Sequence, residues 1–491
     1  MKNLISLGLC IFCILKLYGQ DTYPITFHSL LNEKIHDITE KDGVIVGVGR
    51  QSIDDYDYST SLGIIWKIDN QLDTISKSFR FNDTTTSFLS ISVCLSGYTV
   101  YGNSFYPPNY DVSGFFKLEL DNDLNIISKT NIDLSSSLFK WLYFAKTIDD
   151  YTYFFGNETD SLGNIVQTIT KVDSVSNLID KFYYNDDWGQ FKECLHDPDS
   201  NLFYVFTMGM LNRNNSIMVF NDSLELISSK EFPSKYDYLT GDDDVSYENN
   251  LDVSWYSDST FLVGCTHSRS YPRRAPHIEH DFGYSILDTT MSLQPIQYIG
   301  TYDTVDHAGF NSNHDYITLA SIYYCGTKND IIDFYPRQPS WIVAGKFDHD
   351  LNKIYERYYG GDANYKTAVI KALSNGGCVI GAKRYDHLTQ GYEWDATFLK
   401  LDSDGYITSS SGNINPPKSI KIYPNPVTDF CYVESNDVGE VMISDLRGRV
   451  LKIISVKKGA NQIDLSALKP SFYNLIFRSK TIISSHKIIK L

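Results

Sequence analysis

One pattern recurs seven times between residues 63 and 405: an apolar run that ends in Asp or Asn and is followed at once by turn residues. Examples are GIIWKIDNQL (63–72), GFFKLELDNDL (114–124) and ATFLKLDSDG (396–405). The aligned residues are Asp69, Asp121, Asp173, Asn221, Asp288, Asp348 and Asp402, which lie 52, 52, 48, 67, 60 and 54 positions apart. A near-regular period of this length is typical of chains built from copies of one supersecondary unit.

A strand-like hairpin precedes most copies of this run, and its second half ends at Gly. The clearest hairpins are KDGVIVGVG (41–49), LSGYTVYGN (95–103), DDYTYFFGN (149–157), DSTFLVGCT (258–266) and NGGCVIGAK (375–383). The fourth copy, at 196–209, fits loosely, and the sixth, at 313–321, is the weakest. Three or four strands in each of seven units predict an all-β, seven-bladed β-propeller, and residues 23–30 supply a candidate strand to close the last blade. A series of β-sandwiches is the alternative, although the regular period favours a ring.

Composition agrees with a strand-rich chain, because aromatics make up 14% of the residues and include 36 Tyr and 27 Phe. The net charge of −17 divides unevenly: residues 1–20 carry +2, residues 21–417 carry −25 and residues 418–491 carry +6. Such an acidic ring argues against nucleic acid as a partner, since binding a phosphate backbone needs a positive surface.

Residues 1–20 have the form of a signal peptide, with Lys2 before an apolar segment and Tyr18-Gly19-Gln20 as the expected cleavage region. The apolar segment is too short to span a bilayer, and no later run is long enough, so no transmembrane segment is expected. The mature chain therefore leaves the cytoplasm. Its six cysteines are Cys94, Cys194, Cys265, Cys325, Cys378 and Cys431. They are dispersed and mostly lie in apolar runs, which favours buried free thiols over disulfides or a zinc site.

Long aromatic loops are the strongest functional signal in the predicted ring, which covers residues 21–407. In a propeller, the loops between second and third strands project from one face, where ligands usually bind. The candidate ligand-binding residues in these loops are Tyr106, Tyr110, Tyr271, Tyr335, Tyr392 and Trp394. Exposed Tyr and Trp side chains suit sugars or partner proteins. We therefore expect a glycan- or protein-binding module.

Other chemistry is less well supported. The Asp-rich turns at 121–123, 348–350 and 402–405 suggest calcium, but Asp, Asn and Gly also build tight hairpins, and none has the full acidic loop with a terminal Glu. The His- and Arg-rich loop at 267–281 suggests a metal or an anion, although a solvated loop explains it as well. No nucleophile or phosphate-loop signature is present, so no catalytic residue, metal or cofactor is assigned. A polysaccharide hydrolase or lyase and a purely structural surface protein stay open as alternatives.

The last repeat, from Lys353, resembles the repeat of bacterial secreted β-propellers. Tyr359-Gly360-Gly361, Asn375-Gly376-Gly377 and Lys400-Leu401-Asp402 match that pattern, whereas the earlier repeats are more degenerate. This resemblance implies a scaffold and no particular activity.

A Ser-, Asn- and Pro-rich linker at 408–417 leads to a small domain with period-2 strand patterns at 418–491, expected to be a β-sandwich. This domain resembles the type A C-terminal sorting domain of type IX secretion cargo. The matching residues include Tyr423, Pro424, Asn425, Pro426, Asp445 and Gly448. Ser471-Phe472 stands where the family usually has Gly. The resemblance implies that the type IX secretion machinery is a partner and that the protein reaches the cell surface or the medium.

Overall fold

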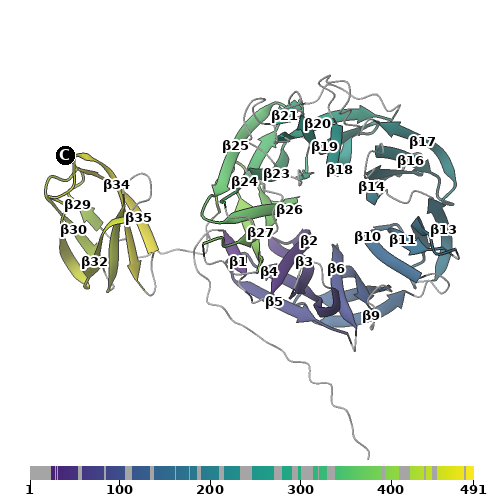
Figure 1. Ribbon diagram of the computed structural model, residues 1–491, viewed down its shortest axis with the longest axis horizontal. Helices are drawn as coiled ribbons and strands as arrows, with labels where there is room; N and C mark the ends of the chain where they lie inside the picture. Colours follow the sequence, from purple (N-terminus) through teal and green to yellow (C-terminus); the bar gives the residue numbers. More distant parts are fainter. Residues whose placement is uncertain are drawn as a thin grey trace, which may run out of the picture. The chain divides into compact units, whose positions relative to one another are not determined.

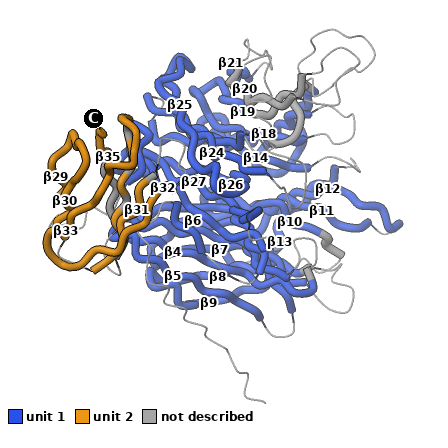
Figure 2. The backbone as a smooth tube through the Cα atoms, turned by 60° about the vertical axis from the view of Figure 1, so that its left-hand side comes forward, with its two compact units in different colours: residues 1–408 blue, residues 409–491 orange. Residues whose placement is uncertain are grey.

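The computed structural model describes residues 24–27, 29, 31–53, 58–81, 84–105, 113–132, 138–160, 162–175, 177–184, 190–208, 215–232, 246–269, 279–289, 297–299, 313–318, 320–328, 338–388, 393–408, 421–435, 438–444, 450–479 and 483–490. The chain divides into two compact units, residues 1–408 and residues 409–491 (Figure 2). The predicted signal segment at 1–20 and most of the predicted linker lie outside the described residues.

Seven four-stranded antiparallel sheets stand in a ring in the first unit, which is a seven-bladed β-propeller (Figure 1). Blades 1 to 3 are β2 (Asn32–Lys41), β3 (Val44–Ser52), β4 (Leu62–Ile68) and β5 (Thr74–Phe79); β6 (Thr85–Cys94), β7 (Gly97–Phe105), β8 (Ser113–Asp121) and β9 (Ile126–Ile132); and β10 (Leu138–Ile148), β11 (Tyr151–Thr159), β12 (Ile165–Val172) and β13 (Leu178–Tyr184). Blades 4 to 6 are β14 (Gln190–Asp197), β15 (Leu202–Met208), β16 (Asn215–Phe220) and β17 (Leu226–Phe232); β18 (Ser246–Ser257), β19 (Thr260–Arg269), β20 (Glu279–Asp288) and β21 (Gln297–Ile299); and β22 (Asn313–Asp315), β23 (Ile322–Lys328), β24 (Trp341–Phe347) and β25 (Lys353–Gly360). Blade 7 combines β26 (Asn364–Ala372), β27 (Cys378–Tyr385) and β28 (Asp395–Leu401) with β1 (Ile25–Phe27). A short 3-10 turn, η1 (Tyr58–Thr60), lies between β3 and β4. The first strand of each blade is innermost in Figure 1.

The ring closes through β1, which is the outermost strand of blade 7. Ile25, Thr26 and Phe27 pair with Phe398, Thr397 and Ala396 in antiparallel register. The Phe27 ring packs against Phe398 of blade 7 and Trp66 of blade 1, so the closing strand also joins the core between these blades. The prediction that a strand within residues 23–30 closes the last blade is confirmed.

The apolar runs fill the interfaces between blades, because both faces of a blade's middle strands pack against neighbouring blades. For example, Val46 and Val48 of blade 1 share one core cluster with Phe88, Val100 and Phe116 of blade 2. The cysteines follow the same logic: Cys194, Cys325, Cys378 and Cys431 are buried free thiols, and Cys94 is a half-buried one. The side chain of Cys265 lies outside the described residues.

The recurring Asp or Asn begins the hairpin between a blade's third and fourth strands. In blade 2, Asp121 Oδ1 accepts hydrogen bonds from the backbone amides of Asp123 (2.9 Å) and Asn125 (2.7 Å). The same two bonds form at Asp69, Asp173, Asn221, Asp348 and Asp402. These six turns, called the turn ring below, confirm the hairpin interpretation of the Asp-rich segments.

A buried leucine completes several of these turns in a left-handed conformation. Leu124 has a φ of 60°, and Leu224 and Leu351 have similar values. Glycine adopts this φ more easily, and blade 7 uses Gly405 there. The three leucines, however, are buried in core clusters, so burial of the side chain offsets the backbone strain.

Lysines that precede the Asp by two positions join adjacent blades. Lys67 Nζ donates to the carbonyl of Asn122 in the next blade at 2.7 Å, and Lys171 Nζ donates to the carbonyl of Asp222 at 2.7 Å. Lys346 makes the corresponding contact with the carbonyl of Ser403 at 3.3 Å. The repeated Lys-x-Asp pattern therefore serves the scaffold: the Asp forms its own turn, and the Lys binds the neighbouring turn.

The second unit contains two antiparallel sheets around one core. One sheet consists of β29 (Lys421–Tyr423), β30 (Phe430–Ser435) and β33 (Gly459–Asp464). The other has the order β32 (Val450–Val456), β31 (Gly439–Ser444), β34 (Ser471–Ser479) and β35 (Ile483–Lys490). Alternate residues of β30 are buried and exposed, as expected for a sheet with one face on a core.

Candidate ligand-binding channel

Five of the innermost strands carry a β-bulge in their first half or at their midpoint. The pairing with the second strand shifts by one residue at His36, Leu89, Tyr143, Lys192 and Ala368, which together are called the bulge ring below. A bulge adds one residue to one strand and re-aims its side chain.

Glycine opposite the bulge explains why the second run of the repeat ends at Gly. A Cβ atom at Gly49, Gly102 or Gly156 would lie 1.9, 2.5 or 2.3 Å from a backbone carbonyl oxygen of the innermost strand. These distances are far below van der Waals contact, so the bulge in blades 1 to 3 requires glycine at this position.

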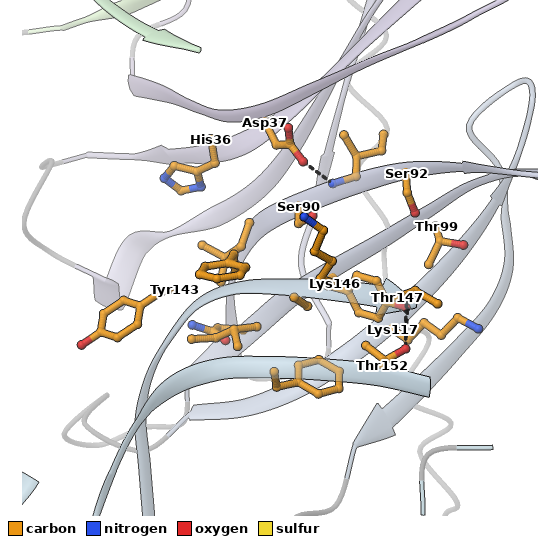
Figure 3. Close-up of a pocket in the computed structure, with 18 of the residues that line it drawn as sticks. His36, Asp37, Ser90, Ser92, Thr99, Lys117, Tyr143, Lys146, Thr147 and Thr152 are labelled. Atoms are coloured by element: carbon orange, nitrogen blue, oxygen red, sulfur yellow. Dashed lines mark hydrogen bonds between the residues drawn. The ribbon is translucent and has the colours of Figure 1, made fainter. Parts of the chain in front are cut away.

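Four members of the bulge ring, His36, Leu89, Tyr143 and Lys192, line one cavity of about 1470 Å³ (Figure 3). The cavity also reaches polar side chains on neighbouring strands, including Ser87, Ser90, Asn103, Thr147, Asn157 and Gln167. Trp141 and Phe105 add aromatic surface to its wall. Antiparallel pairing places the start of β6 beside the end of β7.

The two carboxylates nearest the bulges already have donors. Asp37 accepts from the backbone amides of Ile38 (2.8 Å) and, in the next blade, Ile91 (2.9 Å; Figure 3), and burial raises the pKa of Asp37 to about 6. Glu193 accepts from Lys146 Nζ at 2.8 Å and from its neighbouring backbone amide at 2.8 Å. These two acids therefore hold the walls together, and the rest of the lining combines hydroxyl, amide and ammonium groups with the carboxylates of Asp149, Asp150 and Asp173.

Lys192 differs from the other cationic groups described above. It is half-buried, it lines the cavity, and the described residues give its ammonium no hydrogen bond or ion pair. Burial lowers the pKa of Lys192 to about 8, because removal from water disfavours the charged form. The nearest acid in sequence, Glu193, is bound to Lys146 instead.

Two amide side chains of blade 3 present buried oxygens without donors. Asn157 is 7% exposed and Gln167 is 3% exposed, and neither Asn157 Oδ1 nor Gln167 Oε1 has a hydrogen-bond partner in the described part of the chain. Asn157 Nδ2 donates to the Tyr143 hydroxyl at 3.0 Å, and Gln167 lies beside the same hydroxyl. Burial raises the pKa of that phenol. Both oxygens belong to residues that line the cavity, so a bound molecule with hydrogen-bond donors would satisfy them.

Among the aromatic residues chosen from the sequence, the structure describes Trp394, which does not line this cavity. Tyr106, Tyr110, Tyr271, Tyr335 and Tyr392 lie outside the described residues. Trp394 was expected on an exposed loop, and that expectation is wrong, because the side chain is 1% exposed. Its backbone amide donates to Asn32 Oδ1 at 3.1 Å and its carbonyl accepts from the Glu33 amide at 2.7 Å, which fixes Trp394 at the junction of blades 7 and 1.

One group of side chains in the described residues has the spacing of cation ligands. Oxygen and nitrogen atoms of Asp348, His349 and Asp350 lie within 4.8 Å of one another. Asp348, however, accepts from two backbone amides and, through Oδ2, from Asn352 Nδ2 at 3.0 Å. Its oxygens therefore serve the turn, as in the other members of the turn ring.

The predicted sorting motif begins on the surface of the second unit. Tyr423, Pro424, Asn425 and Pro426 are exposed, and the Tyr423 ring stacks on Tyr432 with centroids 5.8 Å apart. Asn425 Oδ1 accepts from the backbone amide of Ile489 at 2.9 Å, which ties the motif to the last strand. Asp445 and Gly448 lie outside the described residues.

Comparison with known proteins identifies the tail. Residues 421–491 match the secretion system C-terminal sorting domain family. No curated protein matches the chain. Similar solved structures include polysaccharide lyase Uly1, with 10% identity, a TM-score of 0.44 and coverage of 75% of this chain and 90% of that one.

A Synechocystis apocarotenoid oxygenase has 8% identity and a TM-score of 0.43, with coverage of 79% of this chain and 91% of its own. A Penicillium chrysogenum alpha-L-arabinanase has 9% identity and a TM-score of 0.40, with coverage of 63% and 92%. Such distant likenesses carry no functional argument. The described part of the chain has no helix with the length and apolar character that a membrane crossing needs. The chain is a secreted or cell-surface β-propeller protein that carries a type IX secretion C-terminal sorting domain at residues 421–491.

Proposed function

We propose that the propeller is a binding module for an extracellular glycan and that the glycan enters the central cavity. The observation that carries this proposal is the pair of buried, donor-free oxygens of Asn157 and Gln167. A buried acceptor without a donor costs about 1–3 kcal/mol, so a bound molecule that supplies donors to both oxygens would gain affinity from these contacts.

Sugars supply hydrogen-bond donors, which the two buried side-chain oxygens need. Each sugar residue carries several hydroxyl donors and an apolar C–H face, and the cavity wall presents amide oxygens next to the aromatic rings of Trp141 and Tyr143. Delivery beyond the outer membrane places the protein where such polymers occur. The proposed ligand therefore follows from the site and the location together.

The test measures binding of the mature protein to a panel of neutral and acidic polysaccharides by titration calorimetry, while product assays record any chain cleavage. Gln167→Leu removes one donor-free oxygen with little change in size. We expect it to lower affinity at least tenfold and to leave stability unchanged or about 1 kcal/mol higher. Binding without cleavage supports a binding module, whereas cleavage makes the protein an enzyme.

Thr168→Val is a matched control on the same strand. The Thr168 hydroxyl is also buried without a partner in the described residues, but Thr168 does not line the cavity. It should leave affinity unchanged. If both variants bind like the wild type, or if no polysaccharide binds, then water alone occupies the cavity and the glycan proposal fails.

Delivery is tested separately by deletion of residues 418–491. We expect the truncated protein to accumulate in the periplasm, as shown by cell fractionation and surface proteolysis. Normal surface delivery of the truncated protein would show that another segment directs export.

A further inference from the structure

We propose that the ligand carries an anionic group, a carboxylate or a sulfate on a sugar ring, and that this group pairs with Lys192 of the bulge ring. This inference rests on the proposed glycan function and names the class of glycan. The inference is based on Lys192, a cationic side chain at the bulge of β14. It lines the cavity and has no hydrogen bond or ion pair in the described residues.

The neighbours of Lys192 explain why the protein itself does not neutralise it. Glu193 follows it directly, but its Oε1 accepts from Lys146 Nζ and from the backbone amide of Cys194. Asp37, in blade 1, is held by two backbone amides. The bulge thus places an ammonium group in the cavity while both of these carboxylates are engaged elsewhere.

Desolvation makes this arrangement unfavourable in the empty protein. Burial lowers the pKa of the Lys192 ammonium, so its charge is destabilised where it stands. A ligand anion would reverse this effect through a charge-assisted hydrogen bond. Strand β14 contacts β10 and β11, and Lys192 lines the same cavity as Tyr143 and Asn157. A glycan in this cavity could therefore place hydroxyls at the amide oxygens and an acidic group at the lysine.

The test compares full-length protein binding to dextran, dextran sulfate and polygalacturonate at constant ionic strength. We expect at least tenfold tighter binding to one acidic polymer, and whichever polymer is preferred identifies the anion as sulfate or carboxylate. Lys192→Met should remove this preference, because it should weaken binding to the acidic polymer far more than binding to dextran, while Lys192→Arg should retain most of it.

Lys129→Met is the matched control. Lys129 is also a half-buried lysine whose pKa burial lowers, but it lies over the Phe81 and Phe116 rings and outside the cavity. Both methionine variants lower the net charge equally, so a general charge effect would weaken binding in both. An equal loss of affinity for the acidic polymer in the two methionine variants overturns the role of Lys192. So does dextran binding that depends on Gln167 but shows no preference for an acidic polymer. Both outcomes leave the glycan function standing. Absence of binding to any polymer overturns both.

Discussion

The two ends of the propeller use the same polar residue types in opposite ways. In the turn ring, each of the six Asp or Asn residues accepts two backbone amides, and lysines such as Lys67 and Lys171 bind the neighbouring turn. Beside the cavity, by contrast, the ammonium of Lys192 in the bulge ring and the side-chain oxygens of Asn157 and Gln167 have no partners in the described structure.

This contrast shows that residue type does not identify function in a repeat protein. A lysine two positions before an Asp recurs in several blades and has a structural partner. Lys192, at the bulge of blade 4, lines the cavity and has no partner in the described residues. Polar residues that depart from the repeat are therefore the better guide to a ligand site.

The largest effect is expected at a glycine opposite a bulge. Gly156→Val would place side-chain atoms against the Trp141 carbonyl oxygen, which lies 2.3 Å from an ideal Cβ. Because that oxygen belongs to a buried strand, we expect a loss of about 3 kcal/mol or more in unfolding free energy, measured by chemical denaturation. Gly163→Ala, where no atom lies within 4 Å, is the control and should cost only about 1 kcal/mol for its positive φ. Equal losses would mean that the bulge does not need glycine.

A smaller effect with a pH dependence is expected at Glu33, near the start of β2. Burial raises the pKa of Glu33 to about 8, above its ordinary value of 4.5. The folded state therefore keeps this proton where the unfolded state loses it. Stability from this group is complete below about pH 4.5 and is lost as the pH rises through about 8.

Glu33→Gln retains an acceptor for the Ala396 amide and cannot ionise. We expect the variant to be at least about 1.4 kcal/mol more stable than the wild type at pH 9, which corresponds to one pKa unit, and similar at pH 5. The exposed Glu225, at the turn ring, gives the control Glu225→Gln, which should show no such difference. If the unfolding free energy changes with pH in the same way in the wild type, Glu33→Gln and Glu225→Gln, then Glu33 and Glu225 are equally solvated.

The smallest effect is expected in the turn ring. Asp121→Ala removes the acceptor of two backbone amides in an exposed turn, so we expect a loss of about 1 kcal/mol in denaturation experiments. Asp121→Asn should be nearly neutral, because blade 4 already uses Asn221 in this role. Neither variant should change polysaccharide affinity. A change in affinity would contradict the conclusion that the turn ring is structural and contributes nothing to ligand binding.

Much of the scaffold could be predicted from the sequence because turns demand particular residues. Asp121 and its equivalents marked the hairpins, and the segment at 23–30 indicated the closing strand, which the pairing of Ile25–Phe27 confirms. The tail motif at Tyr423-Pro424-Asn425-Pro426 led to the sorting domain, which the family match confirms.

The candidate site could not be predicted in the same way. A bulge needs only one extra residue, and in sequence Lys192 looks like an ordinary break in a strand pattern. Asn157 and Gln167 lie on separate strands and reach one cavity through the pairing of β11 with β12. The prediction that Trp394 is exposed was wrong for the opposite reason. Its loop position suggested exposure, but contacts with β2, far away in sequence, bury it.

The closing strand has a consequence for processing of the exported chain. Cleavage after residue 20 would leave only four residues, 21–24, before β1. A protease that trims a few residues more would remove the strand that holds blade 7 to the beginning of the chain, although every other blade would keep its four strands. The site of N-terminal maturation is therefore also a determinant of whether the ring is complete.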